Sequence, residues 1–194
     1  MVDGSLQPLP LPVRCLREAC AVTVITTPTG YRSCNRSAEQ DEGARTMDAL
    51  KLLKQDHAKV KKMLSELDET TERAVKTREA VFTQLKHDLE IHEAIEEEFL
   101  YPALKEHPKT RDIALEGYEE HHVVDEVMGE MLHLPVSDET WTAKFTVMKE
   151  NLEHHIEEEE RDMFEEARRA LGDDELADLG DRMTARKEAL EATT

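Results

Sequence analysis

The sequence predicts an all-α protein, an antiparallel up-down-up-down four-helix bundle with a short extra C-terminal helix. Two observations indicate this fold class. From residue 47 onward, apolar residues recur at steps of three and four, which is the period of an amphipathic helix. The composition agrees, because only 4% of the residues are aromatic while 36% are charged, a balance that suits long helices better than sheets.

Four long helices with short connections are expected over residues 47–171, and short connections favour antiparallel neighbours. In chain order, the positions expected to face inward are Leu50, Leu53, His57, Val60, Leu64 and Leu67; Leu85, Leu89, His92, Glu96, Phe99 and Ala103; Ala114, Gly117, His121, Val124, Met128 and Met131; and Trp141, Phe145, Met148, Leu152, His155, Glu159 and Met163. Pro102 and Pro108 bound the second helix, and Asp138 can cap the fourth. Gly172 ends the fourth, and residues 173–192 are expected to form a helix that packs on the bundle.

Residues 1–46 differ in composition from the rest. They contain all three cysteines and as many acids as arginines, so the net charge of −19 falls entirely on residues 47–194. We expect this segment to be a disordered N-terminal extension, or to precede a native start at Met47. Cys15, Cys20 and Cys34 lack the closely paired spacing of a zinc site.

The charge also limits the partners. A strongly acidic chain is unsuited to nucleic acid or anionic membrane surfaces, and no apolar run reaches the roughly 18 residues that span a bilayer. No catalytic Ser/His/Asp set and no Gly-rich phosphate loop is evident. We therefore expect cations and small inorganic molecules as partners of a cytoplasmic protein, either a monomer or a homodimer.

Each predicted helix carries polar residues on its inward, otherwise apolar face. They are His57 in the first helix, His92 and Glu96 in the second, His121 in the third, and His155 and Glu159 in the fourth. Unpaired polar groups in a core cost several kcal/mol together, so a shared partner is needed. Four imidazoles and two carboxylates form a ligand set for non-haem iron, manganese or zinc. Because residues four apart share a helix face, each His-x-x-x-Glu pair can place one ligand on one metal and a bridge on two.

The segments around these residues resemble the hemerythrin-like HHE cation-binding family. They are Gln55-Asp56-His57, His92-Glu93-Ala94-Ile95-Glu96-Glu97-Glu98 with Tyr101-Pro102, Glu119-Glu120-His121-His122, and His154-His155-Ile156-Glu157-Glu158-Glu159-Glu160. The resemblance covers about residues 47–170 and is strongest to bacterial, especially actinobacterial, hemerythrin-like proteins, whose C-terminal helix is similar to residues 174–191.

The resemblance implies two non-haem iron ions joined by an oxo or hydroxo bridge. It assigns the bridging carboxylates to Glu96 and Glu159, and the terminal nitrogens to His57, His92, His121 and His155. The same ligands also accept manganese or zinc. The family's oxygen carriers have a second third-helix histidine, and the matching position here is Gly117.

The missing imidazole favours turnover over reversible oxygen carriage. We therefore expect a di-iron protein that reacts with peroxide, dioxygen or nitric oxide, with a catalase-like activity against oxidative stress as its enzymatic form. The alternative is a binding module that senses oxygen, nitric oxide or iron, or buffers iron, without turnover. A metal-free structural bundle is the third hypothesis.

Several neighbouring residues are left open. His122 and His154 point off the inward face, and Glu160 is read as a solvated charge that would also fit a variant of the ligand motif. Glu93 is likewise expected to be a solvated charge. Ideal helix phase places Tyr101 opposite Glu96, although a bend before Pro102 would turn its hydroxyl toward the metal.

Overall fold

The computed structural model describes residues 47–193, so the expectation for residues 1–46 lies outside the described residues. The described part is built from helices, which confirms the all-α prediction. The elements are α1 Ala49–Asp68, α2 Val75–Ile95, η1 Glu96–Leu100, α3 Tyr101–Lys105, α4 Arg111–Met131, α5 Glu139–Glu158, η2 Glu159–Met163 and α6 Phe164–Glu191. Within residues 47–193, no helix combines the length and apolar character needed to cross a bilayer.

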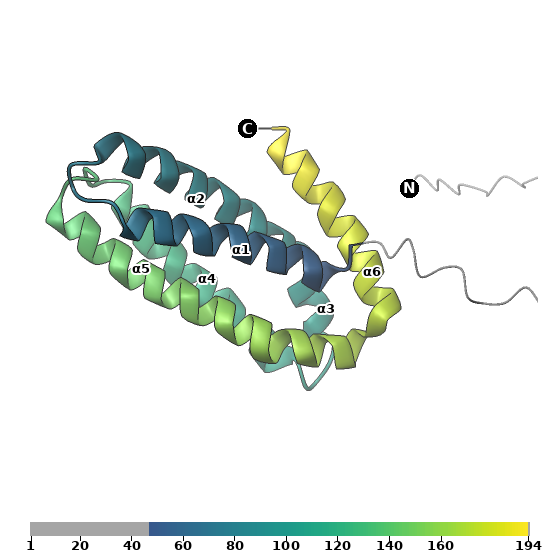
Figure 1. The fold of residues 1–194 in the computed structure, drawn as a ribbon. Helices are drawn as coiled ribbons and strands as arrows, with labels where there is room; N and C mark the ends of the chain where they lie inside the picture. Colours follow the sequence, from purple (N-terminus) through teal and green to yellow (C-terminus); the bar gives the residue numbers. More distant parts are fainter. Residues whose placement is uncertain (1–46, 194) are drawn as a thin grey trace, which may run out of the picture. The chain divides into compact units, whose positions relative to one another are not determined.

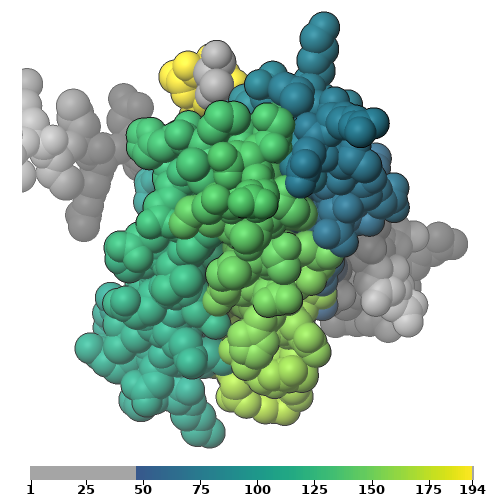
Figure 2. All heavy atoms as spheres, turned by 90° about the vertical axis from the view of Figure 1, so that its left-hand side faces the viewer, coloured from purple at the N-terminus to yellow at the C-terminus, as the bar shows by residue number. Residues whose placement is uncertain are grey.

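The long helices lie side by side. α1 and α2 form one hairpin, α4 and α5 form a second, and the loops that close both hairpins lie at the same end (Figure 1). Seen from that end, the atoms of α4 and α5 lie beside each other and those of the α1–α2 hairpin lie next to them (Figure 2). Asp48 caps α1 by accepting from Lys51 N at 2.9 Å, and Asp138 caps α5 by accepting from Thr140 N at 2.7 Å.

The second and fourth helices each contain one π-helical turn, which the periodicity did not predict. These turns, η1 and η2, begin at Glu96 and Glu159. A π turn adds one residue to the helical repeat, so the inward face moves on by one position after it. The prediction that Phe99 and Ala103 face inward is therefore wrong. Both are only partly buried, and the fully buried residues are Leu100, Tyr101 and Leu104.

The apolar core consists of two clusters along the bundle. One lies toward the loops that close the hairpins and contains residues such as Leu64, Leu85, Met128 and Trp141. The other lies toward α3 and α6 and contains residues such as Leu53, Leu100, Ala114 and Phe164. The predicted ligands fall between these clusters in every helix, so a polar layer separates two apolar ones.

α6 changes direction at Gly172, where φ is +78°. This left-handed conformation is one that glycine adopts without the Cβ penalty of other residues. The segment after Gly172 contacts α1 and α2 (Figure 1). At Gly180 the backbones are so close that an added Cβ would lie 2.1 Å from Met47 O. The C-terminal segment is therefore fitted closely onto the start of α1.

Candidate metal centre

The polar layer contains all six residues that the sequence predicted as ligands. None of them is more than 3% exposed: His57, His92, Glu96, His121, His155 and Glu159. Each of the long helices contributes at least one of them, at a matching depth. The structure gives their positions, and their role as metal ligands stays a prediction.

The ligand atoms of these side chains form two groups, each within 4.8 Å. The first group comes from His57, His92, Glu96 and Glu159, and the second from Glu96, His121 and His155. Glu96 belongs to both, because its Oε2 lies 3.3 Å from His92 Nε2 and 3.4 Å from His121 Nε2.

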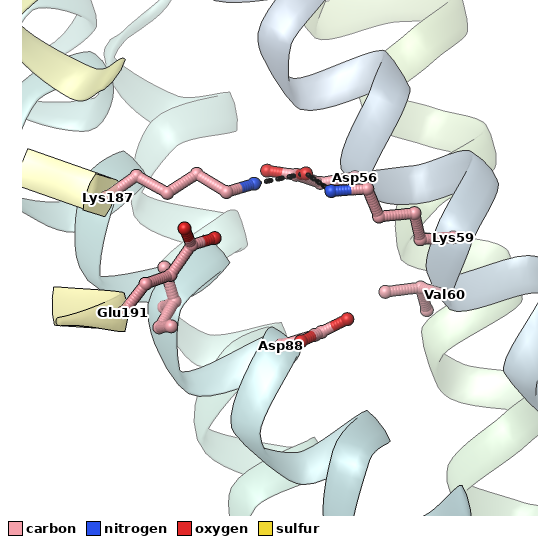
Figure 3. Close-up of a pocket in the computed structure, with 7 residues that line it drawn as sticks. Asp56, Lys59, Val60, Asp88, Lys187 and Glu191 are labelled. Carbon is pink, nitrogen blue, oxygen red and sulfur yellow. Dashed lines mark hydrogen bonds and ion pairs between the residues drawn. The ribbon is translucent and has the colours of Figure 1, made fainter. Parts of the chain in front are cut away.

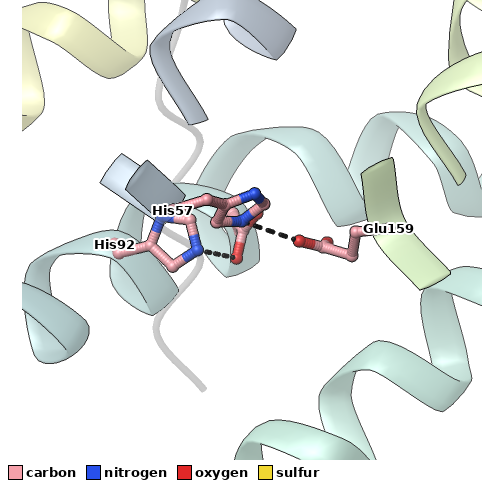
Figure 4. Close-up of side chains that lie close together, drawn as sticks. His57, His92 and Glu159 are labelled. Carbon is pink, nitrogen blue, oxygen red and sulfur yellow. Dashed lines mark ion pairs between the residues drawn. The ribbon is translucent and has the colours of Figure 1, made fainter. Parts of the chain in front are cut away.

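Glu159 makes a matching pair of contacts. Its Oε2 lies 3.2 Å from His57 Nε2 and 3.7 Å from His155 Nε2. Figure 4 shows the contact with His57 beside the ring of His92. Each carboxylate therefore contacts one imidazole from the α1–α2 hairpin and one from the α4–α5 hairpin. Two cations, each held by a pair of imidazoles and joined by both carboxylates, would have this symmetry.

Several of these atoms form no hydrogen bond within residues 47–193, although they lie 3.2–3.7 Å from one another. His57 Nε2, Glu159 Oε2 and both carboxylate oxygens of Glu96 are buried without a hydrogen bond from residues 47–193. The Nε2 atoms of His121 and His155 face each other at 3.2 Å. Each unpaired buried polar atom costs about 1–3 kcal/mol. Cations between these atoms would satisfy them together, so the residues fit a metal group.

The two inner carboxyls differ in their affinity for protons. Burial, reinforced by the charge of Glu159, raises the pKa of Glu96 well above its usual range. Burial also acts to raise the pKa of Glu159, but the neighbouring His155 and His57 outweigh it and lower that pKa to about 2. A bound cation would oppose this rise in the pKa of Glu96, because a positive charge beside a carboxyl favours its ionised form.

Three of the four imidazoles also hydrogen-bond a carboxylate on their outer side. The pairs are His57 Nδ1 with Glu160 Oε1 at 3.0 Å, His121 Nδ1 with Glu97 Oε1 at 3.0 Å, and His155 Nδ1 with Glu120 Oε2 at 2.7 Å. A carboxylate at Nδ1 fixes the tautomer and leaves Nε2 free for a metal. The sequence pattern did not predict these partners, although each is the direct chain neighbour of a predicted ligand.

The π turn η1 brings Tyr101 into the cluster. Tyr101 is fully buried, its hydroxyl donates to Glu159 Oε1 at 3.1 Å, and it lies 3.2 Å from His121 Nε2. The prediction that Tyr101 lies opposite Glu96 is therefore wrong, because the extra residue in η1 turns Tyr101 toward the inner face of the helix. Burial and the charges of Glu96 and Glu159 raise the pKa of Tyr101 well above its usual value, so its hydroxyl keeps the proton.

Gly117 makes room for that hydroxyl. A Cβ at Gly117 would lie 2.8 Å from Tyr101 Oη and 2.9 Å from Tyr101 Cζ, closer than real Cβ atoms approach other atoms. The position that carries a histidine in oxygen carriers is thus occupied here by the edge of a tyrosine from the neighbouring helix. The buried position of Tyr101 therefore depends on the absence of a side chain at Gly117.

The other open residues lie outside the inner cluster. His122 and His154 have side chains 65% exposed, beside Glu126 at 3.5 Å and Glu158 at 3.4 Å. Glu160 lies on the outer side of His57, as described above, and also contacts Lys61 at 3.1 Å. The expectation that Glu93 is solvated is wrong, because it is only 7% exposed and burial raises its pKa to about 8.

The fold and this cluster define a helical protein with a buried histidine and carboxylate site suited to cations. Comparison with known proteins gives the same class. The sequence profile described as Hemerythrin HHE cation binding domain matches residues 48–167. The chain therefore belongs to the hemerythrin HHE cation-binding family, as its motifs indicated.

Relatives occur in mycobacteria. The proteins Rv2633c of Mycobacterium tuberculosis and Mb2666c of Mycobacterium bovis are each 31% identical over 146 residues, covering 74% of this chain and 88% of theirs. The crystal structure of an HHE cation-binding domain-containing protein from Mycobacterium kansasii, a homologue of Rv2633c, superposes with a TM-score of 0.66. It is 32% identical and covers 75% of this chain and 88% of its own.

Proposed function

We propose that this chain binds two iron ions in the polar layer and that the iron pair reacts with peroxide, dioxygen or nitric oxide. Peroxide dismutation, a catalase-like activity, is the turnover reaction that we favour. The observation that carries the proposal is the pair of matched contacts: Glu96 and Glu159 each contact one imidazole from either helical hairpin. This arrangement supports the ligand set His57, His92, Glu96, His121, His155 and Glu159.

The functional unit in this proposal is the antiparallel up-down-up-down bundle of residues 47–171. Its long helices supply all six ligands, and residues 173–192 form the extra C-terminal helix that packs on it. The contacts of the C-terminal segment with α1 and α2 support this division.

A bound iron pair, in which each iron changes by one electron, would supply the two-electron change that each half of peroxide dismutation requires. The protein's own residues hold the cluster and control what reaches it. The six side chains are at most 3% exposed and lie between two apolar clusters, so bulk water is excluded. Such a buried site favours a small inorganic reactant, which agrees with a reaction that needs no organic substrate.

Tyr101 is the proposed source of a proton at the cluster. Its hydroxyl holds a hydrogen bond to Glu159 Oε1 and lies beside His121 Nε2, so it reaches both halves of the site. Its raised pKa keeps the proton in place until a stronger base forms nearby. Because the ring fills the space beside Gly117, we propose turnover rather than oxygen carriage as the function of the site.

The test is oxygen evolution from peroxide by the purified, iron-loaded protein. We expect catalysis above that of free iron, loss of activity in His92→Ala, and wild-type activity in His154→Ala, whose imidazole is exposed. Wild-type activity no higher than that of free iron would contradict the catalase-like reaction. Reversible binding of dioxygen or nitric oxide without turnover would instead support the alternative, a sensing or iron-buffering module.

A further inference from the structure

The outer carboxylates follow one direction around the bundle. Each comes from one helix and faces the histidine of the next: Asp56 of α1 faces His92, Glu97 of η1 faces His121, Glu120 of α4 faces His155, and Glu160 of η2 faces His57. Each acid is also the chain neighbour of a ligand on its own helix. The four contacts thus form a closed ring in which every helix orients the imidazole of its neighbour.

One contact in this ring differs from the others. Three are hydrogen bonds of 2.7–3.0 Å, whereas Asp56 Oδ2 lies 4.0 Å from His92 Nδ1. Both of these atoms are buried and have no hydrogen-bond partner within residues 47–193. A buried carboxylate and a buried imidazole that face each other would normally close this gap to form a hydrogen bond, because a buried polar atom without a partner is destabilising.

The C-terminal segment of α6 explains why the gap stays open. The ammonium group of Lys187 is bound to Asp56 Oδ1, and Lys59 contacts the same oxygen at 3.4 Å (Figure 3). The side chain of Lys187 is only 15% exposed, while that of Lys59 is 59% exposed. Asp56 is therefore held mainly by Lys187, through Oδ1, while its other oxygen, Oδ2, is the one nearest His92.

We propose that Lys187 is a positioning residue for the metal centre, acting through Asp56 on His92. By holding Oδ1 and offsetting the charge of the carboxylate, Lys187 keeps His92 the least polarised of the four imidazoles. The pair His57 and His92 then donates less electron density than the pair His121 and His155, so the two metal positions are unequal. The C-terminal helix thereby tunes the reduction potential of the site. This inference rests on the proposed binding of iron.

The physical expectation follows from the hydrogen bond at Nδ1. A carboxylate that accepts a hydrogen bond from Nδ1–H makes the imidazole a stronger donor to the metal. A stronger donor favours the ferric over the ferrous ion, and so lowers the midpoint potential. Removal of Lys187 leaves the charge of Asp56 without its main partner and frees the carboxylate to bind His92. The midpoint potential should then fall.

The experiment is a redox titration of the iron-loaded full chain, followed by its optical spectrum. We expect Lys187→Met to shift the midpoint potential to a lower value. Lys187→Arg, which keeps the positive charge, should have the potential of the wild type. Asp56→Asn should shift the midpoint potential to a higher value, because the substitution removes the negative charge that faces His92 at 4.0 Å. Arg186→Met is the control, because the exposed Arg186 anchors the same helix through Glu98 at 2.8 Å.

The outcomes separate this inference from simple anchoring of α6. An unchanged or raised potential in Lys187→Met would overturn it, as would an equal shift in Arg186→Met. If Lys187→Met does not fold, Asp56→Asn and Lys187→Arg still decide, and an Asp56→Asn potential equal to that of the wild type would overturn the inference. Failure of the wild-type chain to bind iron would defeat the proposed function as well, whereas iron binding with no shift in any variant would defeat only this inference.

Discussion

At the scale of single residues, Tyr101 and Gly117 set this site apart from a cluster of imidazoles and carboxylates alone. The hydroxyl of Tyr101 contacts both Glu159 and His121, and Gly117 leaves the space that the tyrosine ring needs. Neither contact follows from the sequence at ideal helix phase. The sequence showed Gly117 in place of a histidine, but it did not predict that Tyr101 fills the space beside it.

Replacement of Tyr101 by Phe tests the role of the hydroxyl. The ring and its packing remain, so we expect iron content to be unchanged while the rate of peroxide turnover falls about 10- to 100-fold, as is common when a hydrogen-bond partner of a ligand is lost. Oxygen evolution measures this. Tyr118→Phe is the matched control, because the hydroxyl of Tyr118 donates to the backbone carbonyl of Glu97 at 3.3 Å and not to a predicted ligand. A wild-type rate in Tyr101→Phe would remove the tyrosine from the proposed chemistry.

Replacement of Gly117 by Ala tests the close approach to Tyr101. The added methyl group would overlap the tyrosine, so we expect a loss of about 1–3 kcal/mol in the free energy of unfolding and reduced turnover. Gly129→Ala in the same helix is the control, since no described atom lies within 4 Å of the added group. That variant should gain up to about 1 kcal/mol from helix propensity. If denaturant unfolding gives Gly117→Ala a free energy of unfolding equal to or above that of the wild type, the close packing of Gly117 against Tyr101 is contradicted.

At the scale of elements, helical periodicity predicted the faces of the helices but not their π turns. Every predicted inward residue of the first and third helices is buried, from Leu50 to Leu67 and from Ala114 to Met131. The prediction failed after Glu96, where Leu100 and Tyr101 replace Phe99 on the inner face. Phe99 and Leu100 are both apolar, so the sequence pattern fits a helix with or without the extra residue of the π turn. The α-helical hydrogen bonds lost in a π turn are offset by contacts distant in sequence, which periodicity does not contain.

The contact between α6 and α1 gives a prediction at this scale. Gly180→Ala would place a methyl group 2.1 Å from Met47 O and 2.8 Å from Ala49 N, both of which are backbone atoms. We expect the free energy of unfolding to fall by about 1–3 kcal/mol, although alanine has the higher helix propensity. Chemical denaturation of the metal-free protein measures this. An increase in stability would show that the C-terminal segment is not held this close to α1.

At the scale of the whole molecule, a polar layer divides two apolar clusters, and the metal is expected to bind these parts together. The burial of the six polar side chains in this layer could be predicted because each interrupts an apolar face. The outer carboxylates could not, because they belong to charged faces on which acids are common. The metal-free chain buries four imidazoles and two carboxyls with several atoms unpaired, so a bound metal should contribute strongly to stability.

Removal of the metal should therefore lower the melting temperature. With free iron at about 100 times its dissociation constant, binding adds about 2.7 kcal/mol, which raises the melting temperature by roughly 5–10 °C for a chain of this size. Calorimetry with and without a chelator measures the difference. His154→Ala should keep this difference in melting temperature, and His155→Ala should lose it. An equal melting temperature with and without iron would contradict a metal bound between the two clusters.

The most direct test of the central claim is the iron content of the loaded chain, measured together with its near-ultraviolet spectrum. We expect two irons per chain and charge-transfer bands from an oxo or hydroxo bridge to iron. We expect both to be retained in His122→Ala and His154→Ala, and both to be lost or halved in His121→Ala and His155→Ala. A wild-type chain without bound iron, or one whose iron content is unchanged when His121 and His155 are replaced, would contradict a di-iron site at these residues.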